Sequence, residues 1–139
     1  MVTVAPYSAE HFAGVEALWE EVFPNDPPWN RAAVAIPEKL ANQPELFLVA
    51  EHAGEVLGTA MAGYDGHRGW LYAIAVKPKF QRSGIGSLLL GEAERRLQAV
   101  GCGKINLQIR AGNEAVAAFY RRHGYHVEER VSMGKRLGK

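Results

Sequence analysis

The sequence contains a single cysteine, Cys102, among 139 residues, so no internal disulfide bond can form. Because disulfides persist in oxidising compartments and no basic-then-apolar leader precedes the first predicted helix, a cytoplasmic location is expected. No apolar run approaches the ~20 residues that cross a bilayer, so no membrane partner is predicted. A formal net charge of +1 gives no general attraction to nucleic acid, which is therefore not an expected partner.

Spacings typical of metal ligands are also missing. The five histidines form neither an HExxH pair nor a Cys/His pattern, so no metal is predicted. Cys102 lies between two glycines, without a histidine nearby in sequence. It is expected to be a small, half-buried side chain and not a nucleophile.

The most informative stretch runs from Ala73 to Leu90, as an apolar strand, a short basic turn, a glycine loop and a helix. Pro78 ends the strand, because proline donates no ladder hydrogen bond. After Gly84 the apolar residues recur at helical spacing up to Gly101, a good helix C-cap. Glycines at a helix N-terminus, where backbone N–H groups converge, indicate an anion site.

The spacing of the loop distinguishes between kinds of phosphate site. A dinucleotide fingerprint would need glycine where Leu89 stands, and a Walker A loop would need Lys-Ser/Thr where Glu92-Ala93 stands. The pattern that remains is Gln-x-x-Gly-x-Gly, formed by Gln81, Gly84 and Gly86. For the loop alone, a plain strand-to-helix connection stays an alternative.

This pattern resembles motif A of the GNAT acetyltransferases, whose loop cradles the pyrophosphate of acetyl-CoA. The stretch from Asn113 to Tyr125 is similar to the second signature of that family, N-x-x-A-x-x-x-Y-x-x-x-G-[FY]. Residues 25–28, 63–69 and 133–137 look like the YpeA-like group of bacterial GNAT proteins. Resemblance to that group does not indicate a substrate.

Apolar periodicity and turn residues predict the elements of one domain, 1–139. Strands are expected over 2–4, 45–51, 56–62, 70–76, 104–109, 125–129 and 131–137, and helices over 8–22, 29–40, 84–100 and 113–123, with a kink or restart at Pro37. The order β-α-α-β-β-β-α-β-α-β-β is α+β, a mixed and mostly antiparallel sheet flanked by helices, and it resembles the GNAT fold. The strands 70–76 and 104–109 should form a parallel pair.

The resemblance implies acetyl-CoA as the cosubstrate. Its pantetheine arm would lie along strand 70–76, where that strand and strand 104–109 splay apart, and a backbone N–H near Ile74 or Ala75 would face the thioester carbonyl. An ordinary buried strand is the alternative. The implied contacts are Ile74, Ala75, Val76, Gln81, Arg82, Ser83, Gly84, Ile85, Gly86, Ser87, Asn113 and Tyr120. Arg82 is alternatively a solvated charge, and Asn113 alternatively a helix cap.

Tyr120 is the catalytic candidate that the resemblance implies, as the proton donor to the departing CoA thiolate. Its alternative is a half-buried helix tyrosine with its hydroxyl at the surface, beside Phe119 as the core anchor. No carboxylate or histidine lies on strand 70–76, where related enzymes often carry a glutamate. The amine is therefore expected to lose its proton to water or through a water held by Tyr72. Glu51, Asp65 and His67, each acting through a water, are the alternative bases.

The predicted function is transfer of an acetyl group from acetyl-CoA to a primary amine by direct attack in a ternary complex. The amine, on a small molecule or a peptide or protein, is expected between the first two helices and the 64–70 turn. Candidate lining residues are Trp29, Tyr64, Asp65 and His67. A non-catalytic acyl-CoA-binding sensor or interaction module is the second hypothesis, and the resemblance leaves a homodimer open.

Overall fold

The computed structural model describes residues 1–138. Its contacts divide the chain into two compact units, Met1–Gln108 and the residues from Ile109 onward. The first unit holds the sheet and three of the four α-helices, and the second holds the fourth. A single domain over 1–139 stays a prediction.

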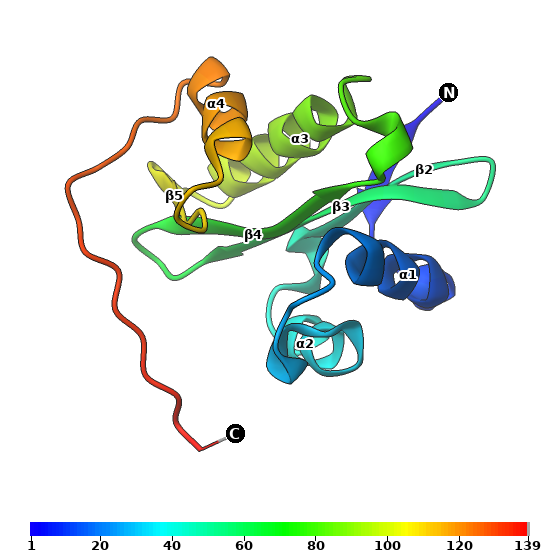
Figure 1. Ribbon diagram of the computed structural model, residues 1–139, viewed down its shortest axis with the longest axis horizontal. Coiled ribbons are helices and arrows are strands. Elements are labelled where there is room, and N and C mark those ends of the chain that lie inside the picture. The colour runs from blue at the N-terminus through cyan, green and yellow to red at the C-terminus, as the bar shows by residue number, and fades with distance from the viewer. Residues whose placement is uncertain (139) are drawn as a thin grey trace. The chain divides into compact units, whose positions relative to one another are not determined.

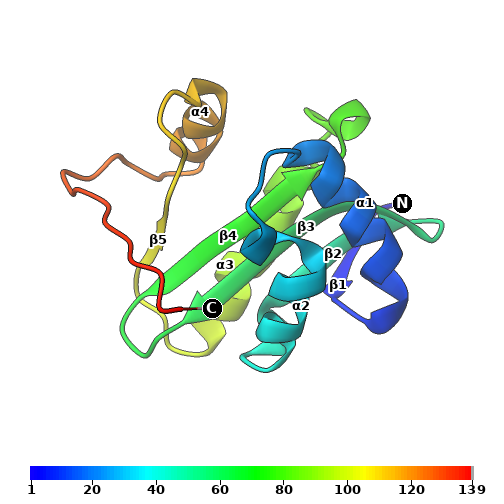
Figure 2. The ribbon, with the colours of Figure 1, turned by 60° about the horizontal axis from the view of Figure 1, so that its bottom comes forward.

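The first unit is built on one five-stranded sheet, with strands in chain order from one edge to the other. Figure 2 shows them from β1 to β5. The strands are β1 (Thr3–Pro6), β2 (Phe47–His52), β3 (Glu55–Tyr64), β4 (Gly69–Val76) and β5 (Ile105–Leu107). β1 to β4 are antiparallel neighbours, and β5 pairs with β4 in parallel. The predicted α+β class and the parallel pair are therefore confirmed.

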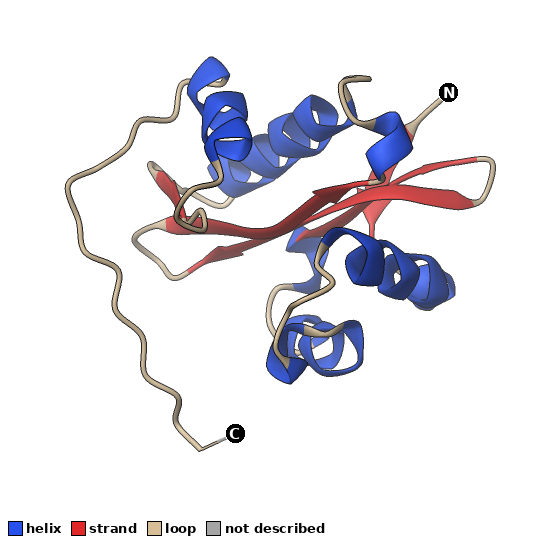
Figure 3. Ribbon diagram, in the orientation of Figure 1, coloured by secondary structure: helices blue, strands red, loops and turns tan. Residues whose placement is uncertain are grey.

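Helices cover both faces of this sheet. α1 (Phe12–Val22) and α2 (Ala32–Leu40) lie on one face, and α3 (Ile85–Ala99) lies on the other (Figures 1 and 3). Each is amphipathic, and α1 buries Val15, Leu18 and Trp19 towards the sheet. Four short 3₁₀ turns connect these elements: Ala9–His11, Pro28–Asn30, Pro44–Leu46 and Pro78–Phe80.

The second predicted helix is shorter than expected but unbroken at Pro37. Trp29 lies in a separate 3₁₀ turn, and α2 begins after Arg31, whose backbone is extended. Pro37 removes one hydrogen bond late in this nine-residue helix. Of the kink or restart predicted at Pro37, the restart does not occur, because one helix runs through this residue.

Two glycines let the layers approach closely. A Cβ on Gly14 of α1 would lie 2.7 Å from Cγ2 of Val56 on β3. On the other face, a Cβ on Gly58 would lie 2.9 Å from the carbonyl oxygen of Ala75 and 2.9 Å from Cδ1 of Leu89. A backbone carbonyl within the sheet cannot move aside cheaply.

Gly58→Ala is therefore expected to lower the free energy of unfolding by about 1–3 kcal/mol, the usual cost of overpacking a core. Urea denaturation measures it. The matched control is Gly91→Ala, in α3, where a Cβ would meet nothing within 4 Å. That control should be neutral or stabilising by about 0.5–1 kcal/mol, since alanine is the better helix former. A Gly58→Ala protein as stable as wild type would contradict this account of the packing.

The second unit contains α4 (Glu114–Arg122), and Oδ1 of Asn113 caps it by accepting a hydrogen bond from the backbone N–H of Val116 at 3.4 Å. The prediction of two closing strands over 125–129 and 131–137 is wrong: within residues 125–138 the structure has no strand. The apolar side chains that suggested them, Val127, Val131, Met133 and Leu137, are exposed. Alternation alone does not make a strand, because a strand forms only where a partner supplies hydrogen bonds and a face to pack against.

Among residues 1–138, no helix is both long and apolar enough to cross a membrane.

Candidate active site

The glycine loop opens α3 in a conformation that brings backbone N–H groups together. Gly84 is the N-cap residue at φ 90°, and Arg82 also has a left-handed backbone, at φ 68°. The first hydrogen bond of the helix runs from the N–H of Leu88 to the carbonyl of Gly84, at 3.0 Å. The N–H groups between these residues therefore lie ahead of the helix ladder, at the positive end of the helix dipole.

Side chains of the glycine loop stabilise its conformation by hydrogen bonds to nearby backbone carbonyls. The Gln81 amide donates to the carbonyl of Val76 at 3.2 Å, and the Ser83 hydroxyl donates to the carbonyl of Phe80. The backbone N–H of Lys77 donates to the carbonyl of Leu57 at 2.8 Å, which ties the start of the loop to β3. Residues 81–84 are nevertheless exposed. The loop is thus held by its own hydrogen bonds and lies at the surface.

The strand that leads into the loop has an unpaired edge. β5 pairs with β4 only from Gly69 to Leu71, so from Tyr72 to Val76 the pairing recorded in residues 1–138 is with β3 alone. This stretch contains Ile74, Ala75 and Val76. At ~3.3 Å per residue, it offers about 16 Å of strand edge that ends at the loop.

A bulge interrupts β4 within this stretch. Thr59 pairs with Ala75 and Met61 pairs with Tyr72, so Ala73 and Ile74 together oppose Ala60. Ala73 has φ 51°, a left-handed conformation that is unfavourable for a residue with a side chain. Such bulges redirect the local backbone groups.

Tyr64 and Asp65, which are predicted to line the acceptor site, both make hydrogen bonds through their side chains. The Asp65 carboxylate accepts hydrogen bonds from the backbone N–H groups of His67 at 2.8 Å and Arg68 at 2.7 Å. These bonds lower the pKa of Asp65. The Tyr64 hydroxyl donates to the carbonyl of Gly101 at 3.4 Å. Trp29 is 43% exposed.

Because the pKa of Asp65 is depressed in the folded protein, its contribution to stability is present above the unfolded value of about 3.9 and is lost as the pH falls through the folded pKa. The Tm difference between wild type and Asp65→Ala should therefore be largest near neutral pH and shrink below pH ~4. Thermal unfolding from pH 7 to 2.5 tests this. Asp65→Asn, which keeps an acceptor oxygen but cannot ionise, is the control. A Tm difference that stays constant into acid would contradict the role of the carboxylate.

A buried lysine, which the sequence analysis missed, lies on the α2 face of the sheet. Lys39 is 5% exposed, and its ammonium donates to the carbonyl of Ala62 at 2.5 Å and lies 5.8 Å from the centre of the Tyr72 ring. Desolvation lowers the pKa of Lys39 and raises the pKa of the partly exposed Tyr72. The available signal was spacing, since Lys39 continues the buried positions Ala32 and Ile36 of α2.

Tyr120, and not Phe119, is the buried aromatic residue of α4. Tyr120 is 7% exposed, whereas Phe119 is half-buried. Its ring makes edge contacts with Phe119 and Tyr125, at centroid distances of 5.1 and 5.5 Å. Burial raises the pKa of Tyr120 to about 12. The expectation that Phe119 anchors this helix is therefore wrong, and the Tyr120 hydroxyl stays protonated at neutral pH.

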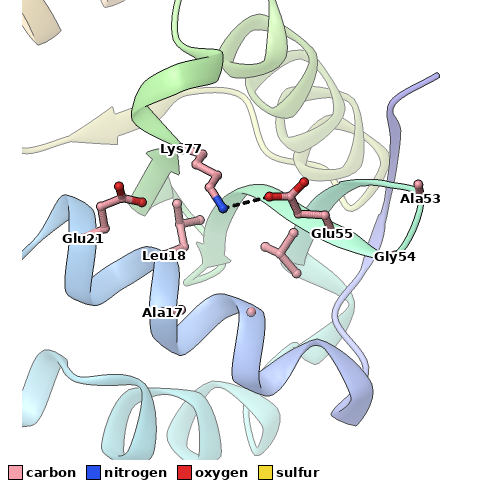
Figure 4. A pocket seen from close by; sticks show the side chains of 9 residues that line it. Ala17, Leu18, Glu21, Ala53, Gly54, Glu55 and Lys77 are labelled. Carbon is pink, nitrogen blue, oxygen red and sulfur yellow. Dashed lines mark hydrogen bonds and ion pairs between the residues drawn. The ribbon is translucent and has the colours of Figure 1, made fainter.

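A separate pocket of about 410 Å³ lies between α1 and the β2–β3 turn (Figure 4). An ion pair of 2.8 Å between Lys77 and Glu55 lines it, together with Leu18 and Glu21 of α1. None of the predicted site residues borders this pocket. No group of three or more His, Cys, Asp or Glu side chains within 1–138 is placed to hold a metal ion.

The family model described as "Acetyltransferase (GNAT) family" matches residues 12–125, most of the chain. The chain belongs to this family. An acetyltransferase of Pectobacterium atrosepticum is 41% identical over 131 residues, which cover 94% of this chain and 92% of the relative. The prediction of an acetyl-CoA-dependent N-acetyltransferase is thus confirmed at the level of the GNAT family. The YpeA-like subgroup stays a prediction.

Solved structures of GNAT enzymes share the fold. AAC(6')-Iy in complex with the bisubstrate analogue CoA-S-monomethyl-acetylneamine superposes with a TM-score of 0.82 at 17% identity, over 99% of both chains. The ribosomal-protein-S18-alanine N-acetyltransferase from Escherichia coli has a TM-score of 0.71 at 24% identity, over 89% of this chain and 77% of that one. At these identities the likeness shows the fold and not the acceptor.

Proposed function

We propose that this GNAT protein transfers the acetyl group of acetyl-CoA directly to a primary amine. The observation that carries this proposal is the unpaired edge of β4, which runs straight into the glycine loop at the start of α3. The pyrophosphate binds the backbone of residues 82–87, with Arg82 adding a charge-assisted contact. The pantetheine arm pairs with the backbone of Ile74 and Val76 as an added strand.

The chemistry needs a donor to the thioester oxygen and a path for protons. The amine nitrogen attacks the thioester carbon, a backbone N–H at Ile74 or Ala75 stabilises the negative oxygen, and the C–S bond then breaks. The amine loses one proton, and the thiolate gains one. Tyr120, protonated at neutral pH because burial raises its pKa to about 12, donates to the departing sulfur. Tyr72, whose pKa is also raised, holds the water that takes the amine's proton and is not itself the base.

The acceptor is a primary amine on a small molecule or on a peptide or protein. Of the two neighbours described above, AAC(6')-Iy is named an aminoglycoside N-acetyltransferase and the other is named for an alanine of a ribosomal protein. The fold therefore serves both kinds of amine. On this chain the amine enters on the α1/α2 face, beside Trp29 and the 64–69 turn with Tyr64, Asp65 and His67. Partly exposed aromatic rings there suit a cationic amine.

Initial rates measured while acetyl-CoA and an amine are both varied test this mechanism, with calorimetry of acetyl-CoA binding alongside. Direct transfer predicts intersecting reciprocal plots and no acetylated enzyme in the mass spectrum. Parallel plots with an acetylated protein would contradict direct attack. Binding without turnover across small-molecule, peptide and protein amines would instead favour an acyl-CoA-binding module.

A further inference from the structure

We propose that Thr59, oriented by Trp19, is a positioning residue that aims the backbone N–H of Ile74 at the thioester carbonyl. The inference rests on the proposed function, because it concerns the donor that stabilises the negative oxygen during acetyl transfer. Neither residue was expected to have a role from the sequence.

The two side chains form a buried hydrogen-bond relay from α1 to the bulge of β4. The indole N–H of Trp19 donates to the hydroxyl oxygen of Thr59 at 2.9 Å, and the Thr59 hydroxyl donates to the carbonyl of Ala73 at 2.9 Å. Thr59 is 0% exposed and Trp19 is 5% exposed. Water therefore does not compete for these groups, and a lost partner would leave a buried polar atom unsatisfied.

The direction of the relay follows from its donors. An indole N–H can only donate, so it occupies the hydroxyl oxygen of Thr59 as an acceptor and leaves the hydroxyl hydrogen for another acceptor. That acceptor is the carbonyl of Ala73. Trp19 therefore fixes the orientation of the Thr59 hydroxyl, and Thr59 in turn fixes the carbonyl of the bulge.

The held carbonyl sets the direction of the N–H on the same peptide group. All peptide bonds described are trans, and in a trans peptide the C=O and N–H point in opposite directions. Because the carbonyl of Ala73 points to the Thr59 side chain on β3, the N–H of Ile74 points away from that side chain. Ile74 also lies in the stretch of β4 that β5 does not pair.

The bulge needs such support. Alanine at φ 51° is in an unfavourable conformation, which persists only where the surroundings hold it. Thr59 is the one polar side chain between Val56 and Ala62, which are otherwise apolar or glycine. If Thr59 served only as the acceptor for the buried indole N–H of Trp19, its hydroxyl would not need to donate to the carbonyl of Ala73. Here one hydroxyl makes both bonds.

The test compares two variants. Thr59→Val keeps the shape of the side chain but loses the hydroxyl, whereas Thr59→Ser keeps the hydroxyl and loses only the methyl group. The chain offers a matched control in Thr3→Val, at an exposed position of β1. Turnover should fall about 10- to 100-fold in Thr59→Val, as expected for a donor displaced from its productive position. The acetyl-CoA KM should change by less than about threefold, and Thr59→Ser should recover most of kcat.

A spectroscopic readout separates positioning from a merely structural role. The infrared stretch of the carbonyl in ¹³C-labelled acetyl-CoA should shift to lower frequency on binding wild type and Thr3→Val, and most of this shift should be lost in Thr59→Val. An unchanged shift in Thr59→Val, whatever its turnover, overturns the inference. If Thr59→Val does not fold, Trp19→Phe carries the test, with a partial loss of the shift expected and an unchanged shift contradicting the relay.

The two proposals fail in different ways. A wild-type protein that acetylates amines while the frequency of the bound carbonyl equals that of free acetyl-CoA overturns the positioning role and leaves the proposed function standing. If the carbonyl frequency of acetyl-CoA shifts on binding to the wild-type protein but no amine is acetylated, the proposed function is overturned. The frequency shifts measured with the Thr59 and Trp19 variants then still test the hydrogen-bond relay.

Discussion

Gly86→Val is expected to weaken acetyl-CoA binding by ~100-fold or more without unfolding the protein. Gly86 is the second residue of α3, and its backbone is not at positive φ, so its backbone conformation accepts a valine. Its branched side chain, however, would stand on the first helical turn, where a pyrophosphate must approach the backbone N–H groups. Loss of several charge-assisted contacts accounts for the size of the effect. Calorimetry of acetyl-CoA and CoA binding measures it.

The control for this variant lies in the same helix. Gly91→Val makes the same change at an exposed position, where a Cβ would meet nothing within 4 Å. It should leave the acetyl-CoA Kd unchanged, and its helix content should match that of Gly86→Val. A folded Gly86→Val protein that binds acetyl-CoA normally would show that the glycine loop is not the pyrophosphate site.

Tyr120→Phe should lower kcat by ~100-fold while the acetyl-CoA Kd stays nearly unchanged. The reason is that a donor to the departing sulfur acts in the transition state more than in the ground state. Burial raises the pKa of Tyr120 to about 12, so the hydroxyl keeps its proton throughout the usable pH range. Steady-state kinetics under conditions where chemistry limits the rate measures the loss.

Tyr125→Phe is the matched control, because Tyr125 lies in the same unit and its ring contacts Tyr120. The family signature also accepts either phenylalanine or tyrosine at this position, so little change in kcat is expected. A Tyr120→Phe enzyme with unchanged kcat would remove Tyr120 from the mechanism.

The pH dependence of kcat/KM shows which group takes the proton from the amine. If water takes the amine's proton, the rising limb of kcat/KM should follow the pKa of each amine tested. Amines of different basicity should therefore give different limbs. A limb fixed near pH 6 to 7 for every amine would point to an enzyme base such as His67.

Local sequence signals were sufficient for most of the fold. The apolar periods, the proline that ends β4 and the glycines that bound α3 predicted the central strand-loop-helix unit, and the parallel partner β5 followed from the handedness rule. The prediction of two closing strands was wrong because alternating apolar residues, such as Val131 and Met133, do not show whether a partner strand is present. Phe119 was wrongly assigned as the core anchor of its helix because adjacent aromatic residues on a helix face different directions, and only packing decides which of Phe119 and Tyr120 is buried.

The candidate site was predictable to the extent that it depends on backbone. Glycines and a helix start suffice to predict convergent N–H groups, which the structure places after Gly84. The roles of Thr59 and Lys39 depend on burial and on partners distant in sequence, which no local pattern encodes. For the same reason, Asp65 looked available to a substrate although its carboxylate closes its own turn. The cytoplasmic location and the homodimer remain predictions.

Following the acetyl group itself is the most direct test of the central claim. The protein is incubated with ¹³C-acetyl-CoA and a panel of small-molecule, peptide and protein amines, and free CoA and labelled N-acetyl product are quantified together by mass spectrometry. Direct transfer predicts that at least one amine yields labelled product in equal amount to the CoA released, at a rate that saturates with both substrates and is lost in Gly86→Val. Tight binding of acetyl-CoA with no labelled product above the enzyme-free rate, for every class of amine, would contradict it.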